Sequence, residues 1–263
     1  MKRIQIISGS PRPKGNTYKM MQLIETRLHE LGEYSIEWLF LKQASLKYCK
    51  GCLQCMKKGE THCPCKDDSD VIKERLLCAD GIIFASPVYV HTVSALMKNF
   101  FDRFAWMCHR PRCVGKSALL VVTTELSGID ETLECMAFPV NTWGMTVAAK
   151  VGAVYRSFET NPAYRAHIEH RFRQAADRFH HQLQTLTMDY AMPKLAFFHL
   201  MKRKVTLHKD MLPYDYQFWK DNGWIDRRFY DDTNVPVLKN KIAETMVKIR
   251  AGSLWKKQAV QSE

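Results

Sequence analysis

Long hydrophobic runs are missing from this chain of 263 residues, and none is long enough to cross a bilayer. We expect no cleavable leader, because a strand-like apolar run begins directly after Met1, Lys2 and Arg3. We find no internal repeat and no low-complexity linker. From these absences we expect a cytoplasmic protein with one main α/β domain and an extension.

Three further features of the sequence limit the classes of protein to which it can belong. Nine cysteines are an odd number for a disulfide framework, and a cytosolic location argues against disulfides as well. The net charge is +12, but the basic residues are spread along the expected helices and no zinc-finger or RNA-binding signature accompanies them. Nucleic-acid binding is therefore not favoured. We interpret the positive charge as attracting anionic cofactors. The sequence contains neither G-x-G-x-x-G nor Gly-Lys-Ser/Thr, which excludes the common dinucleotide fold and the P-loop.

A short polar loop near the N-terminus organises the rest of the chain. Residues 8–17 read SGSPRPKGNT and follow the apolar run Ile4–Ile7. The glycines in this loop allow several backbone N–H groups to point into one small space. We expect Asn16 or Thr17 to cap the next helix, whose N-terminus favours an anion. The hydroxyls of Ser10 and Thr17 and the guanidinium of Arg12 suit phosphate oxygens, so the loop is predicted to be a phosphate cradle.

Strand-like and helix-like segments alternate through the first 155 residues. Strands are expected near 3–8, 35–41, 81–86, 117–123 and 146–154, with helices near 16–32, 69–77, 94–106 and 129–141. Five such alternations predict a doubly wound five-stranded parallel sheet, whose ligands bind beyond the carboxyl ends of its strands. Residues 156–263 predict a mainly helical C-terminal extension, packed on the same domain or on a partner subunit.

The phosphate loop and a second segment together resemble a known family. Residues 86–103, SPVYVHTVSALMKNFFDR, follow the third strand. This string and the Ser-Pro-Arg-x-x-Gly-Asn-Thr string before it resemble the flavodoxin-like NAD(P)H-dependent FMN reductases. The resemblance implies a flavodoxin-like fold and an FMN whose phosphate lies on the first loop. The flavin performs the redox chemistry in such enzymes, so we assign no catalytic side chain.

The resemblance also implies the cofactor-binding residues. Pro87, Val88 and Tyr89 are expected against the flavin ring, and the loop after the fourth strand is a weaker candidate. The full expected set is Ser10, Arg12, Asn16, Thr17, Pro87, Val88, Tyr89, Thr123, Thr124 and Gly128. His91 could take part in proton transfer, although an exposed loop histidine is the simpler interpretation. Asp102 and Arg103 are expected to form ion pairs that fasten their helix.

Five cysteines gather in the loop at residues 45–68. Cys49, Cys52 and Cys55 have C-x2-C-x2-C spacing, and Cys63 and Cys65 follow. Such compact runs hold four-iron clusters in some proteins, while metal-free thiols and a structural zinc site are the alternatives. The run resembles the iron–sulfur flavoproteins, a branch of the same family. This predicts metal ligands Cys49, Cys52, Cys55 and Cys63, with Cys65 as the alternative fourth ligand.

The sequence therefore predicts an oxidoreductase that passes electrons from NAD(P)H, or from a ferredoxin-like donor, to a small acceptor such as a quinone. The resemblance implies a homodimer. Two other functions stay open: a non-enzymatic electron carrier, and a redox sensor whose basic extension binds nucleic acid. The stretch 195–204 could also lie on a membrane surface, although a packed helix explains it as well.

Overall fold

The computed structural model describes residues 1–260, and side chains are described for residues 1–250. The chain divides into two compact units. The first contains Met1–Cys52 and Cys65–Thr187, and the second contains Leu53–Pro64 with the residues from Met188 onward. The cysteine-rich loop is thus shared between the two units.

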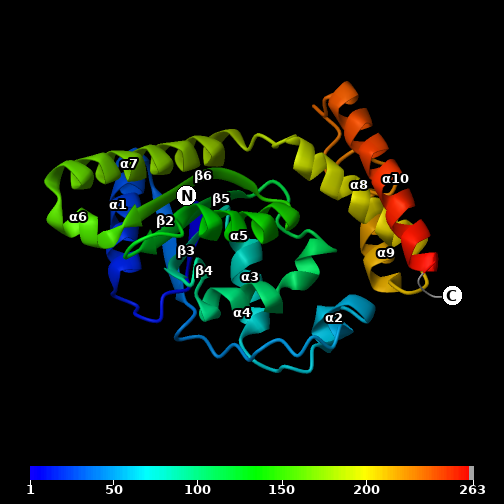
Figure 1. Ribbon diagram of the computed structural model, residues 1–263, viewed down its shortest axis with the longest axis horizontal. Coiled ribbons are helices and arrows are strands. Elements are labelled where there is room, and N and C mark those ends of the chain that lie inside the picture. Colours follow the sequence, from blue (N-terminus) through cyan, green and yellow to red (C-terminus); the bar gives the residue numbers. More distant parts are fainter. Residues whose placement is uncertain (261–263) are drawn as a thin grey trace. The chain divides into compact units, whose positions relative to one another are not determined.

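A parallel sheet forms the centre of the first unit (Figure 1). Its strand order is β2-β1-β3-β5-β6, and every neighbouring pair in this order is parallel. These strands are β1 (Lys2–Ser8), β2 (Tyr34–Phe40), β3 (Gly81–Tyr89), β5 (Ser117–Thr124) and β6 (Thr146–Val154). All eight residues of β5 are buried, as expected for a central strand covered on both faces. The predicted doubly wound five-stranded sheet is confirmed.

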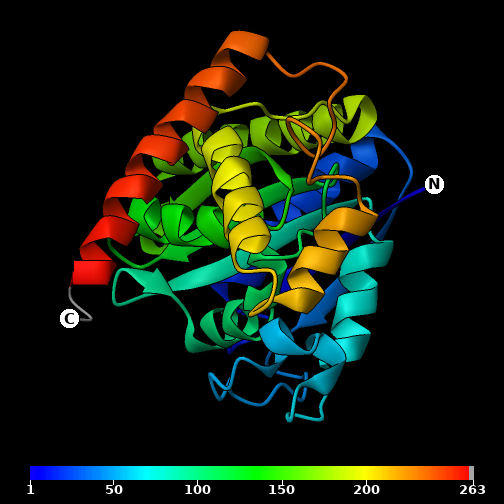
Figure 2. The same ribbon diagram turned by 90° about the vertical axis from the view of Figure 1, so that its right-hand side faces the viewer.

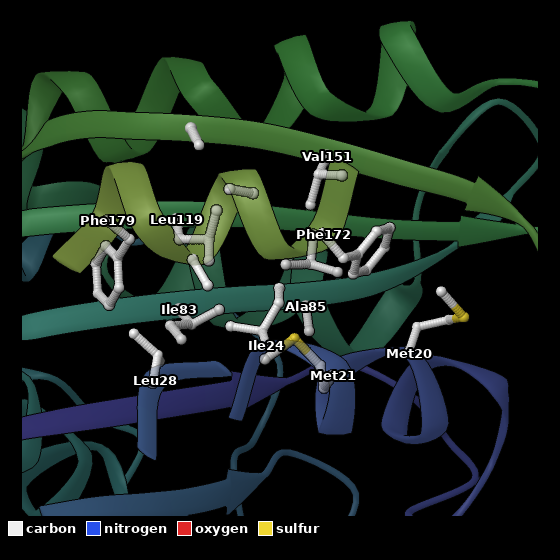
Figure 3. Close-up of a cluster of buried hydrophobic side chains, with 14 of the residues drawn as sticks. Met20, Met21, Ile24, Leu28, Ile83, Ala85, Leu119, Val151, Phe172 and Phe179 are labelled. Carbon is white, nitrogen blue, oxygen red and sulfur yellow. The ribbon is translucent and has the colours of Figure 1, made fainter. Parts of the chain in front are cut away.

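Helices cover both faces of this sheet. The helical segments of the first unit are α1 (Asn16–Leu31), α3 (Ser69–Cys78), α4 (Ala95–Arg103), η2 (Ala105–Cys108), α5 (Ile129–Thr142), α6 (Tyr155–Thr160) and α7 (Pro162–Thr185). Helices α1 and α7 lie together on one face, and α5 packs on β5 and β6 from the other (Figure 1). The core between the sheet and the α1–α7 pair contains Met20, Ile24, Phe172 and Phe179 (Figure 3).

Helix α7 belongs to the sheet unit, although the sequence-based division assigns it to the extension. Its Ile168, Phe172, Phe179 and Leu183 are at most 1% exposed and join the core cluster. Burying an apolar side chain of this size contributes roughly 1.5–3 kcal/mol, so this face holds α7 against the sheet. The compact sheet unit therefore runs to Thr187, and α7 is a part of the predicted extension that packs on the sheet.

The second unit is helical in the part of it that the structure describes. It contains α2 (Gln54–Lys57), η1 (Glu60–His62), α8 (Met192–Leu207), α9 (Pro213–Asp221) and α10 (Val237–Val260). Helix α10 runs beside α8 (Figure 2). Because Leu195, Phe198 and Met201 of α8 are buried, the stretch 195–204 is a packed helix. Among residues 1–260, no helix has the length and apolar character needed to span a membrane.

Candidate functional site

The phosphate loop is fastened to the middle of the sheet. The Gly9 amide donates to the carbonyl of Ala85 in β3 at 2.8 Å, and the Ser94 hydroxyl donates to the Gly9 carbonyl at 2.5 Å. A Cβ atom on Gly9 would lie 2.7 Å from Cβ of Met97, so only glycine fits there. The start of the loop is therefore fixed between β3 and α4.

The remainder of this loop forms a tight turn before α1. The Arg12 amide donates to the Ser10 hydroxyl at 3.2 Å, and the Gly15 amide donates to the Arg12 carbonyl at 2.9 Å. The N-cap of α1 is Gly15, with no side-chain capping bond and no acidic residue in the first turn. The expectation that Asn16 or Thr17 caps this helix is wrong, because the helix begins one residue earlier than such a cap requires. The first-turn N–H groups therefore have no capping side chain, which favours an anion there.

Two side-chain contacts join this loop to the end of β5. The hydroxyls of Thr17 and Thr123 are 2.7 Å apart and buried. Nearby, the Asn16 amide donates to the Glu125 carboxylate at 2.8 Å. The loop after β1 and the loop after β5 thus meet at the carboxyl edge of the sheet, where a doubly wound sheet binds its ligands.

The segment after Ser86 is a hairpin, whereas the sequence predicts that the third strand ends at residue 86. Strand β3 continues to Tyr89 and pairs antiparallel with β4 (Thr92–Val93). The turn falls at Val90 and His91, which have φ values of 51° and 57°. A β-branched residue with positive φ is a steric outlier, and Val90 is also 95% exposed. Such strained, exposed turns are frequent at ligand-binding sites.

His91 connects this hairpin to the loop after β5. Its Nε2 lies 3.2 Å from the Ser127 hydroxyl, and its Nδ1 lies 3.6 Å from the Glu131 carboxylate. Gly128 lies beneath the same hairpin with φ of 87°, and a Cβ atom there would be 2.9 Å from Cγ1 of Val88. His91 and Gly128 therefore hold the hairpin and its neighbouring loop together.

These loops enclose a pocket at the carboxyl edge of the sheet. Its enclosed space is about 50 Å³, and the residues that line it are Ser10, Arg12, Asn16, Thr17, Pro87, Val88, Tyr89, Thr123, Thr124, Glu125 and Tyr155. Nine of the ten expected cofactor residues line this pocket, while Gly128 supports it from the adjoining turn. Because cofactor sites typically measure 300–1,000 Å³, the enclosed part suits a phosphate-sized group and a larger ligand would extend past Tyr89.

The cysteines of residues 45–68 lie in different surroundings. Cys49 and Cys52 are exposed and belong to the first unit, whereas Cys55 and Cys63 are half-buried and belong to the second. Cys65 is buried, and its thiol donates to the Tyr48 carbonyl at 3.6 Å. None of the nine cysteines, all of which lie within residues 1–250, forms a disulfide. Among the side chains of residues 1–250, no three His, Cys, Asp or Glu residues gather in a ready-made metal site.

Comparison with known proteins assigns the family. The NADPH-dependent FMN reductase family matches residues 2–157. An iron–sulfur flavoprotein of Archaeoglobus fulgidus is 31% identical over 230 residues, which cover 86% of this chain and all of that protein. The chain belongs to the NADPH-dependent FMN reductase family, in its iron–sulfur flavoprotein branch. It is therefore an oxidoreductase of the flavodoxin-like fold.

A second relative agrees with the family assignment, and a solved structure agrees with the fold. An iron–sulfur flavoprotein of Methanocaldococcus jannaschii is 44% identical over 99 residues, which cover 37% of this chain and 49% of that protein. The structure of a flavone reductase has a TM-score of 0.56 at 17% identity, covering 72% of this chain and 66% of that one. At that identity the structural likeness concerns the fold alone.

Two pocket residues of this family member are absent from the sequence-based set. Glu125 is on a loop that resembles the family only weakly, and Tyr155 comes directly after β6. The Lys19 ammonium donates to the Tyr155 hydroxyl at 3.1 Å, and this bond raises the pKa of Lys19. Burial raises the pKa of the Tyr155 hydroxyl. One sequence signal could have indicated Tyr155: it directly follows a predicted parallel strand, and the carboxyl end of that strand lies at the same edge of the sheet as the phosphate loop.

Helix α4 fastens the two ends of the cysteine-rich loop within the first unit. The Asn99 amide donates to the Leu46 carbonyl at 3.0 Å, and the Arg103 guanidinium pairs with the Asp67 carboxylate at 2.6 Å. Lys98 pairs with Asp102 on the helix surface at 2.6 Å. The expectation that Asp102 and Arg103 form ion pairs is therefore confirmed.

Proposed function

We propose that this chain is an FMN-dependent oxidoreductase that takes electrons from NAD(P)H or a ferredoxin-like donor and passes them to a small acceptor such as a quinone. The observation that carries the proposal is the pocket at the carboxyl edge, where three loops bring together hydroxyls, a guanidinium and an aromatic ring. FMN would supply the electron and hydride chemistry when bound. The protein's part is to bind and orient it.

The residues present fit FMN. The first-turn amides of α1, which have no capping side chain, would hold the phosphate together with Ser10, Arg12 and Thr17. Pro87, Val88 and the 42%-exposed Tyr89 would border the flavin ring at the open side of the pocket. His91 and Gly128 keep these residues in place by joining the hairpin to the loop after β5. No side chain needs to act as an acid or base.

The cysteines Cys49, Cys52, Cys55 and Cys63 would hold a four-iron four-sulfur cluster. The C-x2-C-x2-C spacing and the iron–sulfur names of the curated relatives support this ligand set. Cys65 is less suited, because its buried thiol already contacts the Tyr48 carbonyl. We further propose a homodimer, which size-exclusion chromatography with light scattering would test.

Substitution of Arg12 by alanine tests the flavin part of the proposal. A charge-assisted hydrogen bond to phosphate contributes roughly 1.5–3 kcal/mol, so the FMN dissociation constant should rise by about 10- to 100-fold. Arg75→Ala is the matched control, because Arg75 is an exposed arginine that lines none of this pocket. Flavin fluorescence titration measures both variants. An unchanged dissociation constant in Arg12→Ala would contradict the proposed phosphate site.

A further inference from the structure

Part of the cysteine-rich loop folds with the C-terminal helices. The segment Leu53–Pro64 contains Cys55 and Cys63, and it belongs to the same unit as residues 188–260. Within that unit, α2 lies against α9. The segment Leu53–Pro64 contains two short helices, α2 with four residues and η1 with three. Helices this short do not hold their conformation alone, so the segment depends on what it packs against.

The contact between Gly59 and Tyr214 joins this segment to α9. A Cβ atom on Gly59 would lie 2.7 Å from Cζ, 2.9 Å from Cε2 and 3.0 Å from Cε1 of the tyrosine. The Gly59 backbone therefore lies directly against the aromatic ring. Gly59 also has φ of 93° and ψ of 157°, a combination that is essentially restricted to glycine. Both its conformation and its surroundings exclude a larger residue.

Helix α9 is itself firmly anchored. Trp219, which is in the same helix as Tyr214, is fully buried. Its ring centre lies 5.2 Å from that of Phe198 in α8. The buried rings of Trp224 and Tyr230 adjoin it, with their own centres 4.8 Å apart. Aromatic rings at such distances make large, well-packed contacts. Tyr214 therefore projects from a rigid support.

We propose that the C-terminal helices serve to position two of the cluster ligands. In this account Tyr214 fixes Gly59, which lies between Cys55 and Cys63, and so holds the segment that presents both thiols. The inference rests on the cluster assigned under the proposed function. It gives the C-terminal extension a role: α9 is a support for the metal-binding half of the cysteine loop. Gly59 and Tyr214 are positioning residues and would not touch the metal.

Four variants of the full chain test this role. Gly59→Ala and Tyr214→Ala disturb the contact, whereas Tyr214→Phe keeps the ring. Gly223→Ala is a matched control, because Gly223 also has a positive φ, of 68°, but a Cβ atom there has no neighbour closer than 3.9 Å. Each protein is purified without oxygen and reconstituted with iron and sulfide. The measurements are the rate of iron loss to a chelator, the electron paramagnetic resonance spectrum of the reduced protein, and the FMN content.

We expect Gly59→Ala and Tyr214→Ala to lose iron about tenfold faster than the wild-type protein, which is typical when support around a metal ligand is removed. Tyr214→Phe and Gly223→Ala should match the wild type. The FMN content should be unchanged in all four, because every proposed FMN residue is in the first unit. If Gly59→Ala misfolds, Tyr214→Ala still tests the contact.

Two different results would contradict the account, and they are distinguishable. A wild-type protein that binds iron, with variants that lose it at the wild-type rate, would overturn the positioning role and leave the cluster intact. A wild-type protein that takes up no iron would overturn the cluster itself, and the positioning role with it. FMN binding is measured independently in both cases.

Discussion

The guanidinium of Arg103 and the carboxylate of Asp67 form a buried ion pair, with Nη1 and Oδ2 2.6 Å apart and both side chains at most 2% exposed. Arg103 also donates to the Lys47 carbonyl at 2.9 Å and the Ser69 hydroxyl at 3.2 Å. These bonds join the end of α4 to both ends of the cysteine-rich loop. The helix that follows the proposed flavin-binding hairpin therefore also holds that loop.

Removal of one partner from this pair should destabilise the first unit strongly. Breaking a buried ion pair on one side typically costs 3–5 kcal/mol, because an uncompensated charge is left behind. We predict a loss of roughly this size for Asp67→Asn, measured by urea unfolding. The exposed pair of Lys98 and Asp102 gives a matched control. Asp102→Asn should change the unfolding free energy by less than about 1 kcal/mol. Equal effects would contradict the structural role of Asp67.

The same carboxylate predicts how stability depends on pH. Burial acts to raise the pKa of Asp67, but hydrogen bonds from Arg103, the Lys47 amide and Ser69 outweigh this effect and hold that pKa below its ordinary value. The stabilisation is therefore complete above the pKa of the unfolded state and is lost as pH falls through that of the folded state. The difference in unfolding free energy between wild type and Asp67→Asn should be constant from about pH 5 to 8 and shrink below about pH 4. If this difference in unfolding free energy already shrank above pH 5, the effect could not come from a carboxylate with a lowered pKa.

Glu125 places a negative charge beside the proposed phosphate site. Its carboxylate accepts a hydrogen bond from the Asn16 side-chain amide at 2.8 Å. The carboxylate therefore repels an anion and also engages an amide group that could otherwise donate to the phosphate. Glu125→Gln should therefore bind FMN about two- to fivefold more tightly, the scale of an exposed charge interaction. Raised salt should reduce the gain by screening. Glu37→Gln, an exposed carboxylate outside the pocket, is the control and should bind as the wild type does. Weaker binding in Glu125→Gln would show that the carboxylate supports the site.

Cys63 and Cys65 should respond differently to substitution by serine. We predict that Cys63→Ser loses most of its iron, while Cys65→Ser keeps its iron and unfolds at lower urea concentration. The physical reason is that Cys65 is 4% exposed and its thiol contacts the Tyr48 carbonyl. Iron and sulfide analysis of anaerobically reconstituted protein measures the first effect, with Cys78→Ser as the control. Iron loss in Cys65→Ser alone would reverse the assignment of the fourth ligand.

Local sequence patterns are enough to predict the sheet. The β5 strand runs from Ser117 to Thr124, one residue beyond the predicted end, because a parallel strand buried on both faces has a continuous apolar run. The hairpin after Ser86 is not predictable in this way. Pro87 suggests a turn, yet the turn falls at Val90 and His91, two residues that rarely adopt positive φ. Tertiary contacts from Ser127 and Gly128 hold that strained turn.

The parts of the site that sequence does not reveal depend on distant contacts. Tyr155 enters the pocket beside Lys19, from which it is separated by 136 residues. Gly59 lies against Tyr214, and nothing in either local segment indicates that contact. By contrast, residues 8–17 and 86–103 are recognisable as candidate ligand-binding segments, because each motif is a short continuous string.

The absorbance spectrum of the wild-type protein, purified without oxygen, tests the central claim most directly. The account predicts flavin bands that remain in solution as free FMN after acid release, together with a broad brown shoulder that dithionite bleaches. Flavin bands without the shoulder would contradict the cluster and leave the flavin site standing. A colourless protein that also fails to take up added FMN would contradict the account as a whole.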